Sequence, residues 1–139
     1  MKQVLIVEDQ RMPRENMERV ISESDNYTLS ASVNGADVAL AICRRQRIDL
    51  ILMDVCTSGN KDGIEAAAEI KAELPNIKII IVTSMVEVGY LQRAREAKVD
   101  SLSVTVWLVQ VVQLPFLCVR RGLIGVVLGA SASPGQNYH

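Results

Sequence analysis

Short apolar runs alternate with amphipathic segments along the first hundred residues of the chain. Residues 3–7, 48–53 and 77–82 are rich in valine, isoleucine and leucine, the composition expected of strands buried on both faces of a parallel sheet. Residues 27–33 alternate apolar and polar side chains, as a less buried strand does. The pattern therefore predicts four strands before residue 84.

Between these runs, apolar residues recur at the spacing of amphipathic helices. The predicted helices are residues 12–24, 34–46, 62–74 and 86–98. In the second of them, Val38, Ala41 and Ile42 are expected to face the core. Pro75 and Asn76 are expected to end the third helix.

The regular alternation of strand and helix predicts an α/β fold with a doubly wound parallel sheet. Residues 101–109, SLSVTVWLV, supply a fifth strand. The five-stranded version of this flavodoxin-like architecture has the strand order 2-1-3-4-5, and its ligands bind at the carboxyl ends of the first and third strands.

Acidic and hydroxyl side chains follow three of the predicted strands. Glu8 and Asp9 follow the first strand, Asp54 the third, and Thr83 with Ser84 the fourth. Each feature alone also fits a solvated loop or a helix cap, but their joint placement favours a site. Clustered carboxylates repel one another, and Mg²⁺ relieves that repulsion. A carboxylate beside a metal can accept a phosphoryl group as an acyl phosphate.

The motifs VLIVEDQ, IDLILMDV, DGIEAAAEIK and IIIVTS resemble the CheY-like receiver domain of two-component response regulators, over residues 1–100. The resemblance implies that Asp54 is the phosphoacceptor, that Thr83 is the switch hydroxyl, and that Ser84 occupies the small position beside it. The implied Mg²⁺ ligands are Glu8, Asp9, Asp54 and the backbone carbonyl of Cys56. A sensor histidine kinase would be the phosphodonor, and the chain would be a switch rather than a turnover enzyme.

The sequence departs from the family pattern at two places. The loop DVCTSGNKDG lacks the usual proline and is one residue longer, so Gly59 and Asn60 are expected to turn it. The family's lysine at the end of the fifth strand corresponds to Thr105, and its switch aromatic corresponds to Leu102. Without that ammonium the site should depend more on Mg²⁺, and phosphorylation should couple weakly to Thr83.

The composition changes after Asp100, beyond which the chain has neither an acidic residue nor a lysine. The fifth helix of a receiver is therefore expected to be absent or non-standard. We expect a receiver domain over residues 1–108 and an apolar tail over residues 109–139 with about ten flexible residues at its end. The tail is expected to support a homodimer or larger assembly, because an uncharged apolar segment must be covered.

Three origins of this tail remain open from the sequence. A membrane anchor would use the 18 uncharged residues 102–119, but Gln110, Gln113 and Pro115 oppose it, so no membrane is expected. A natural variant could pack its tail on the sheet or on a partner subunit. A changed reading frame near residue 101 fits the abrupt end of the family pattern best.

Bulk properties limit the other function classes. A net charge of −1 gives no general attraction to nucleic acid, so none is expected to bind. Three scattered cysteines and an acidic N-terminus without a signal peptide indicate the cytoplasm. A phosphatase of the aspartyl-phosphate kind is an alternative, but it would need a second Asp where Cys56 stands. A flavin-binding fold would meet repulsion from Glu8 and Asp9. A structural module without signalling activity is the remaining alternative.

Overall fold

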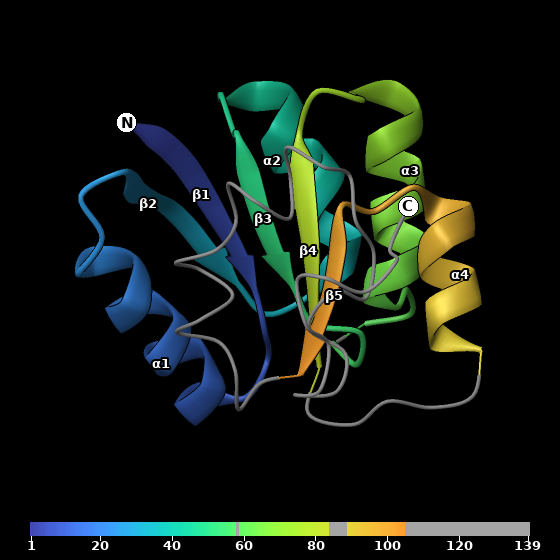
Figure 1. The fold of residues 1–139 in the computed structure, drawn as a ribbon, viewed down its shortest axis with the longest axis horizontal. Coiled ribbons are helices and arrows are strands. Elements are labelled where there is room, and N and C mark those ends of the chain that lie inside the picture. Colours follow the sequence, from blue (N-terminus) through green and yellow to red (C-terminus); the bar gives the residue numbers. More distant parts are fainter. Residues whose placement is uncertain (58, 84–88, 105–139) are drawn as a thin grey trace, which may run out of the picture.

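The computed structural model describes residues 1–57, 59–83 and 89–104. Within these residues, parallel strands form one sheet in the order β2-β1-β3-β4-β5 (Figure 1). The strands are β1 (Lys2–Val7), β2 (Tyr27–Val33), β3 (Leu50–Met53), β4 (Lys78–Thr83) and β5 (Ser101–Val104). The predicted doubly wound α/β sheet and its strand order are confirmed.

Helices cover both faces of this sheet. They are α1 (Arg11–Ser22), the 3₁₀ turn η1 (Ala36–Val38), α2 (Ala39–Arg45), α3 (Gly63–Glu73) and α4 (Tyr90–Ala97). Helix α1 packs on one face, and α2, α3 and α4 pack on the other (Figure 1). Among the described helices, none combines the length and apolar character needed to cross a bilayer. The predictions for the fifth helix and the tail concern residues outside the described ranges.

The core consists of two apolar clusters, one on each face of the sheet. In β1, Leu5 and Val7 join the cluster under α2, α3 and α4, whereas Val4 and Ile6 join the cluster under α1. Successive side chains of a strand point to opposite faces, so an unbroken apolar run fills both clusters. Each aliphatic side chain that is fully buried in this way contributes roughly 1.5–3 kcal/mol to folding.

The segment expected to form one helix over residues 34–46 is instead divided into η1 and α2. The amide of Ala36 donates a hydrogen bond to Thr57 Oγ1 at 3.0 Å, so the segment begins as a turn anchored to a distant loop. The side chain of Val38 is 44% exposed and Ala41 is exposed, so the prediction that they face the core is wrong. The buried positions of α2 are Ala39, Ile42 and Cys43.

A buried ion pair joins α3 to the starts of β4 and β5. Lys71 Nζ lies 3.0 Å from Asp100 Oδ2, and the two side chains are only 9% and 11% exposed. The same carboxylate oxygen accepts the amide of Ile79 at 2.8 Å, and Lys71 also donates to the carbonyl of Ile77. These bonds compensate the cost of removing both charges from water. They fix the position at which the chain enters β5.

Candidate acidic metal and phosphoryl site

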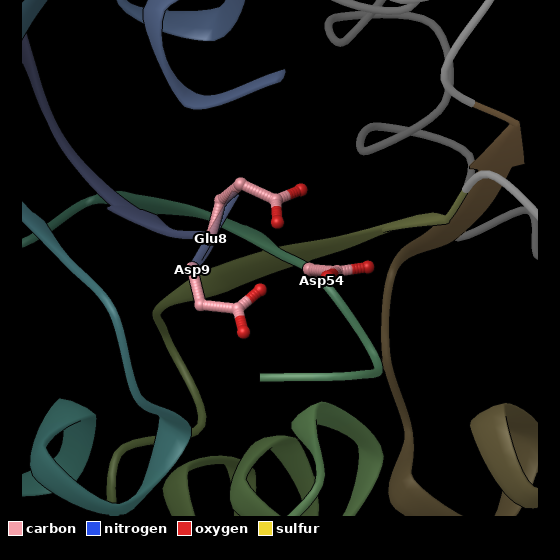
Figure 2. A group of neighbouring side chains, drawn as sticks. All are labelled: Glu8, Asp9 and Asp54. Carbon is pink, nitrogen blue, oxygen red and sulfur yellow. The ribbon is translucent and has the colours of Figure 1, made fainter. Parts of the chain in front are cut away.

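Three carboxylates gather at the carboxyl end of the sheet. Figure 2 shows Glu8 and Asp9, which follow β1, beside Asp54, which follows β3. One oxygen of each side chain lies within 4.8 Å of the others. Sequence reasoning placed these residues at adjacent strand ends, and the structure brings all three together.

The pairing of the strands explains this geometry. Val7 and Met53 are register partners in the parallel β1–β3 pair, so the residue after each strand emerges at the same edge. The amide of Asp54 continues the ladder by donating to the carbonyl of Val7 at 2.9 Å. The amide of Glu8 donates to the carbonyl of Val33, which attaches the same position to β2.

Two of the carboxyl groups resist ionisation. The pKa of Glu8 is raised from its usual 4.5 to about 7, chiefly by burial and also by the charges of Asp54 and Asp9, against a hydrogen bond from the Gln10 amide. Burial also raises the pKa of Asp54, although hydrogen bonds from Glu8 and from backbone amides oppose the rise. A divalent cation would offset the burial and mutual repulsion of these carboxylates, and their oxygen atoms are ligands that suit Mg²⁺.

Of the remaining predicted site residues, the structure describes Thr83 and Cys56 but not Ser84. Thr83 ends β4 with 4% of its surface exposed, and its register partner is Val104 of β5. Cys56 is exposed in the loop after Asp54, and its carbonyl as a metal ligand stays a prediction. Ser84 lies outside the described residues.

The loop after Asp54 is held from two sides. Gly59 has a φ of 99°, in the left-handed region, which confirms that it turns the chain. Thr57 Oγ1 accepts the amide of Ala36 and donates to the carbonyl of Lys61 at 3.4 Å. Thr57 is therefore bonded both to the start of η1 and to Lys61, in a segment that lacks the usual proline.

Sequence reasoning missed a close contact behind Asp54. A Cβ atom at Gly63, the first residue of α3, would lie 1.9 Å from the backbone oxygen of Asp54. Only glycine lets α3 begin this close to the acceptor loop. The Asp-Gly pair that starts α3 was the available signal, because glycine is a poor residue for a helix unless a close approach requires it.

The raised pKa of Glu8 makes stability depend on pH and metal together. Without metal, the unfolded Glu8 carboxyl loses its proton near 4.5 and the folded one only near 7. The native state therefore holds the extra proton between these values, and its stability falls as pH rises through this window, by at most about 3 kcal/mol. Mg²⁺ should raise the melting temperature more at about pH 8 than at about pH 5.5, because protons compete with the metal.

Differential scanning fluorimetry with and without MgCl₂ at both pH values checks this expectation. The Glu8→Gln variant is the control, because it has no carboxyl group to titrate at this position and should lose most of the pH dependence. An equal stabilisation by Mg²⁺ at both pH values would contradict it.

Comparison with known proteins agrees with this geometry. The family described as the response regulator receiver domain matches residues 4–102. Response regulator protein VraR of Staphylococcus aureus is 37% identical over 99 residues, which are 70% of this chain and 46% of that protein. The chain therefore spans about half the length of this curated relative.

Solved structures show the same fold. A DNA-binding response regulator of the LuxR family from Staphylococcus aureus has a TM-score of 0.78 at 25% identity, over 85% of this chain and 98% of that one. A two-component response regulator of the LuxR family from Aurantimonas sp. SI85-9A1 has a TM-score of 0.73 at 24% identity, over 83% and 84% of the two chains.

Proposed function

Because the chain belongs to the response regulator receiver domain family, we propose that it accepts a phosphoryl group on Asp54 in a reaction that requires Mg²⁺. The observation that carries this proposal is the cluster of Glu8, Asp9 and Asp54, with an oxygen of each within 4.8 Å of the others. The family acts in two-component signalling, so the product is a switched state rather than a released metabolite.

The donor in this proposal is a phosphohistidine on a sensor histidine kinase. A carboxylate oxygen of Asp54 forms a bond to phosphorus while the bond from phosphorus to the donor imidazole breaks. The electron pair goes to the imidazole nitrogen, which takes up a proton. Mg²⁺, when bound, supplies charge neutralisation on the transferred phosphoryl oxygens.

Each remaining residue has a proposed role. Glu8, Asp9 and Asp54 would hold the metal, together with the carbonyl of Cys56; these oxygen donors fit Mg²⁺. The Thr83 hydroxyl, at the adjacent end of β4, would bind the phosphoryl group, with Ser84 beside it.

Coupling of phosphorylation to an output is proposed to be weak. Leu102, at the position of the family's switch aromatic, has no exposed surface and packs in the cluster under α2, α3 and α4. A buried leucine lacks the polar group that a tyrosine or tryptophan carries. It therefore cannot exchange one hydrogen bond for another at the surface when Asp54 is phosphorylated. The family's lysine corresponds to Thr105, outside the described residues.

Other parts of the functional assignment are also proposals. We place the receiver domain at residues 1–108, the tail at residues 109–139 and the protein in the cytoplasm. Assembly through the tail and the absence of nucleic-acid binding stay predictions; one similar solved structure is a DNA-binding response regulator. The phosphatase alternative is not favoured, since Cys56 stands two residues after Asp54.

Phosphorylation by acetyl phosphate tests the proposed function. The chain should give a phosphorylated species on a phosphate-affinity gel when Mg²⁺ is present, and none when EDTA removes the metal. The species should disappear in hydroxylamine, which cleaves acyl phosphates. A chain that stays unmodified at saturating Mg²⁺, or that reacts equally well in EDTA, would contradict the proposal.

A further inference from the structure

The side chain of Arg14, in the first turn of α1, reaches back over the loop that carries two of the three carboxylates. Its Nη1 atom donates to Asn34 Oδ1 at 3.0 Å, to the carbonyl of Glu8 at 3.3 Å and to the carbonyl of Asp9 at 3.5 Å. The two carbonyl contacts are long, so the bond to Asn34 is the strongest of the three.

Both ends of this arrangement are anchored. The amide of Arg14 donates to the carbonyl of Gln10 at 3.1 Å, the first hydrogen bond of α1. Asn34 directly follows β2, whose last residue, Val33, accepts the amide of Glu8. The guanidinium therefore connects the start of a helix to the ends of two neighbouring strands, at the backbone of the acidic site.

We infer that Arg14 is a positioning residue for the metal site: it holds the backbone of Glu8 and Asp9 so that their carboxylates meet Asp54. This inference rests on the proposed function. The guanidinium of the half-buried Arg14 donates to the backbone oxygens of Glu8 and Asp9 and to the side chain of Asn34. Its role is therefore to order the loop before a cation arrives, which reduces the ordering cost of binding.

The direction in which Mg²⁺ affinity changes when Arg14 is replaced distinguishes a positioning role from a simple charge effect. If Arg14 acted only as a nearby positive charge, its removal would make the site more negative and strengthen Mg²⁺ binding. If it positions the loop, its removal should weaken Mg²⁺ binding despite the gain in negative potential. A charge effect would also fade at high ionic strength, whereas loss of positioning would persist.

The test is an Mg²⁺ titration of the full chain at low and at high salt. Binding is monitored through the NMR chemical shifts of the backbone amides. We expect Arg14→Gln to weaken Mg²⁺ binding about tenfold at both salt concentrations. Asn34→Ala, which removes the strongest anchor without changing charge, should weaken it in the same direction. Arg14→Lys should restore only part of the affinity, because an ammonium cannot reproduce the planar fork of the guanidinium.

Arg19→Gln is the matched control. Arg19 lies on the same helix and pairs with Glu23 and Asn16, so its loss removes one positive charge without touching the loop. Its affinity for Mg²⁺ should equal that of the wild type or exceed it slightly.

The outcomes separate this inference from the proposed function. Unchanged or tighter Mg²⁺ binding by Arg14→Gln, in a chain whose circular dichroism matches the wild type, would overturn the positioning role and leave the proposed function intact. If Arg14→Gln fails to fold, unchanged binding by Asn34→Ala and Arg14→Lys would overturn it equally. A wild-type chain that binds no Mg²⁺ would overturn both.

Discussion

Replacing Asp54 with asparagine is expected to abolish phosphorylation by acetyl phosphate and, at the same time, to raise the melting temperature. The first effect follows because an amide has no free carboxylate to attack phosphorus. The second follows because burial already raises the pKa of Asp54, so its ionised form is a cost to the fold. Removing that charge also relieves its repulsion of Glu8.

Near neutral pH without metal, the melting temperature is expected to rise by a few degrees, roughly 2–5 °C. Phosphate-affinity gels and thermal denaturation, both on the metal-free and Mg²⁺-loaded protein, measure the two effects. In Mg²⁺ the order should reverse, since the wild type gains from the metal and the variant has lost a ligand.

Asp25→Asn is the matched control, because Asp25 is exposed between α1 and β2, away from the cluster. It should keep full phosphorylation and change the melting temperature by less than about 1 °C. Phosphorylation that survives in Asp54→Asn would show that another residue is the acceptor.

Replacing Gly63 with alanine is expected to destabilise the protein by about 3 kcal/mol, although helix propensity alone predicts the opposite. Alanine is better than glycine within a helix by about 1 kcal/mol. Here the added Cβ would lie 1.9 Å from the Asp54 backbone oxygen and 2.8 Å from Met53 Cγ. Backbone cannot yield as a flexible side chain does, so α3 or the acceptor loop must move.

Chemical denaturation measures this loss, and a drop of roughly 10 °C in melting temperature should accompany it. Phosphorylation should also slow, because the displaced carbonyl belongs to the acceptor itself. The reverse substitution Ala68→Gly is the control: Ala68 is an exposed position of α3, and its replacement should cost only about 1 kcal/mol with normal phosphorylation. A Gly63→Ala variant as stable as the wild type would show that the helix shifts freely.

The sequence was most informative where the polarity of the side chains determines whether they are buried and at which end of a strand they lie. An apolar run such as residues 50–53 can bury all its side chains only in a sheet that is covered on both faces. The strands and their order were therefore predictable. Glu8, Asp9 and Asp54 were predictable as a cluster because the parallel topology places the strand ends at one edge.

The features that were not predicted depend on contacts between distant segments. Val38 lies outward because the turn before α2 is bonded to a distant loop. The amide of Ala36 donates to Thr57, 21 residues away, and no local periodicity indicates that bond. The reach of Arg14 across the loop to Asn34 is similar, since the bond joins positions 20 residues apart. Patterns along the chain indicate helices and strands, whereas hydrogen bonds between distant segments can be recognised only once the helices and strands are packed.

The ion pair between Lys71 and Asp100 has a consequence for how this chain tolerates its unusual C-terminal sequence. Asp100 is the last acidic residue of the chain, and it is bonded before β5 begins. The alignment of Ser101 with Ile80 is therefore determined upstream of the change in composition. The start of β5 is therefore held in register by contacts within the first hundred residues, at the end of the sheet opposite to the acidic site.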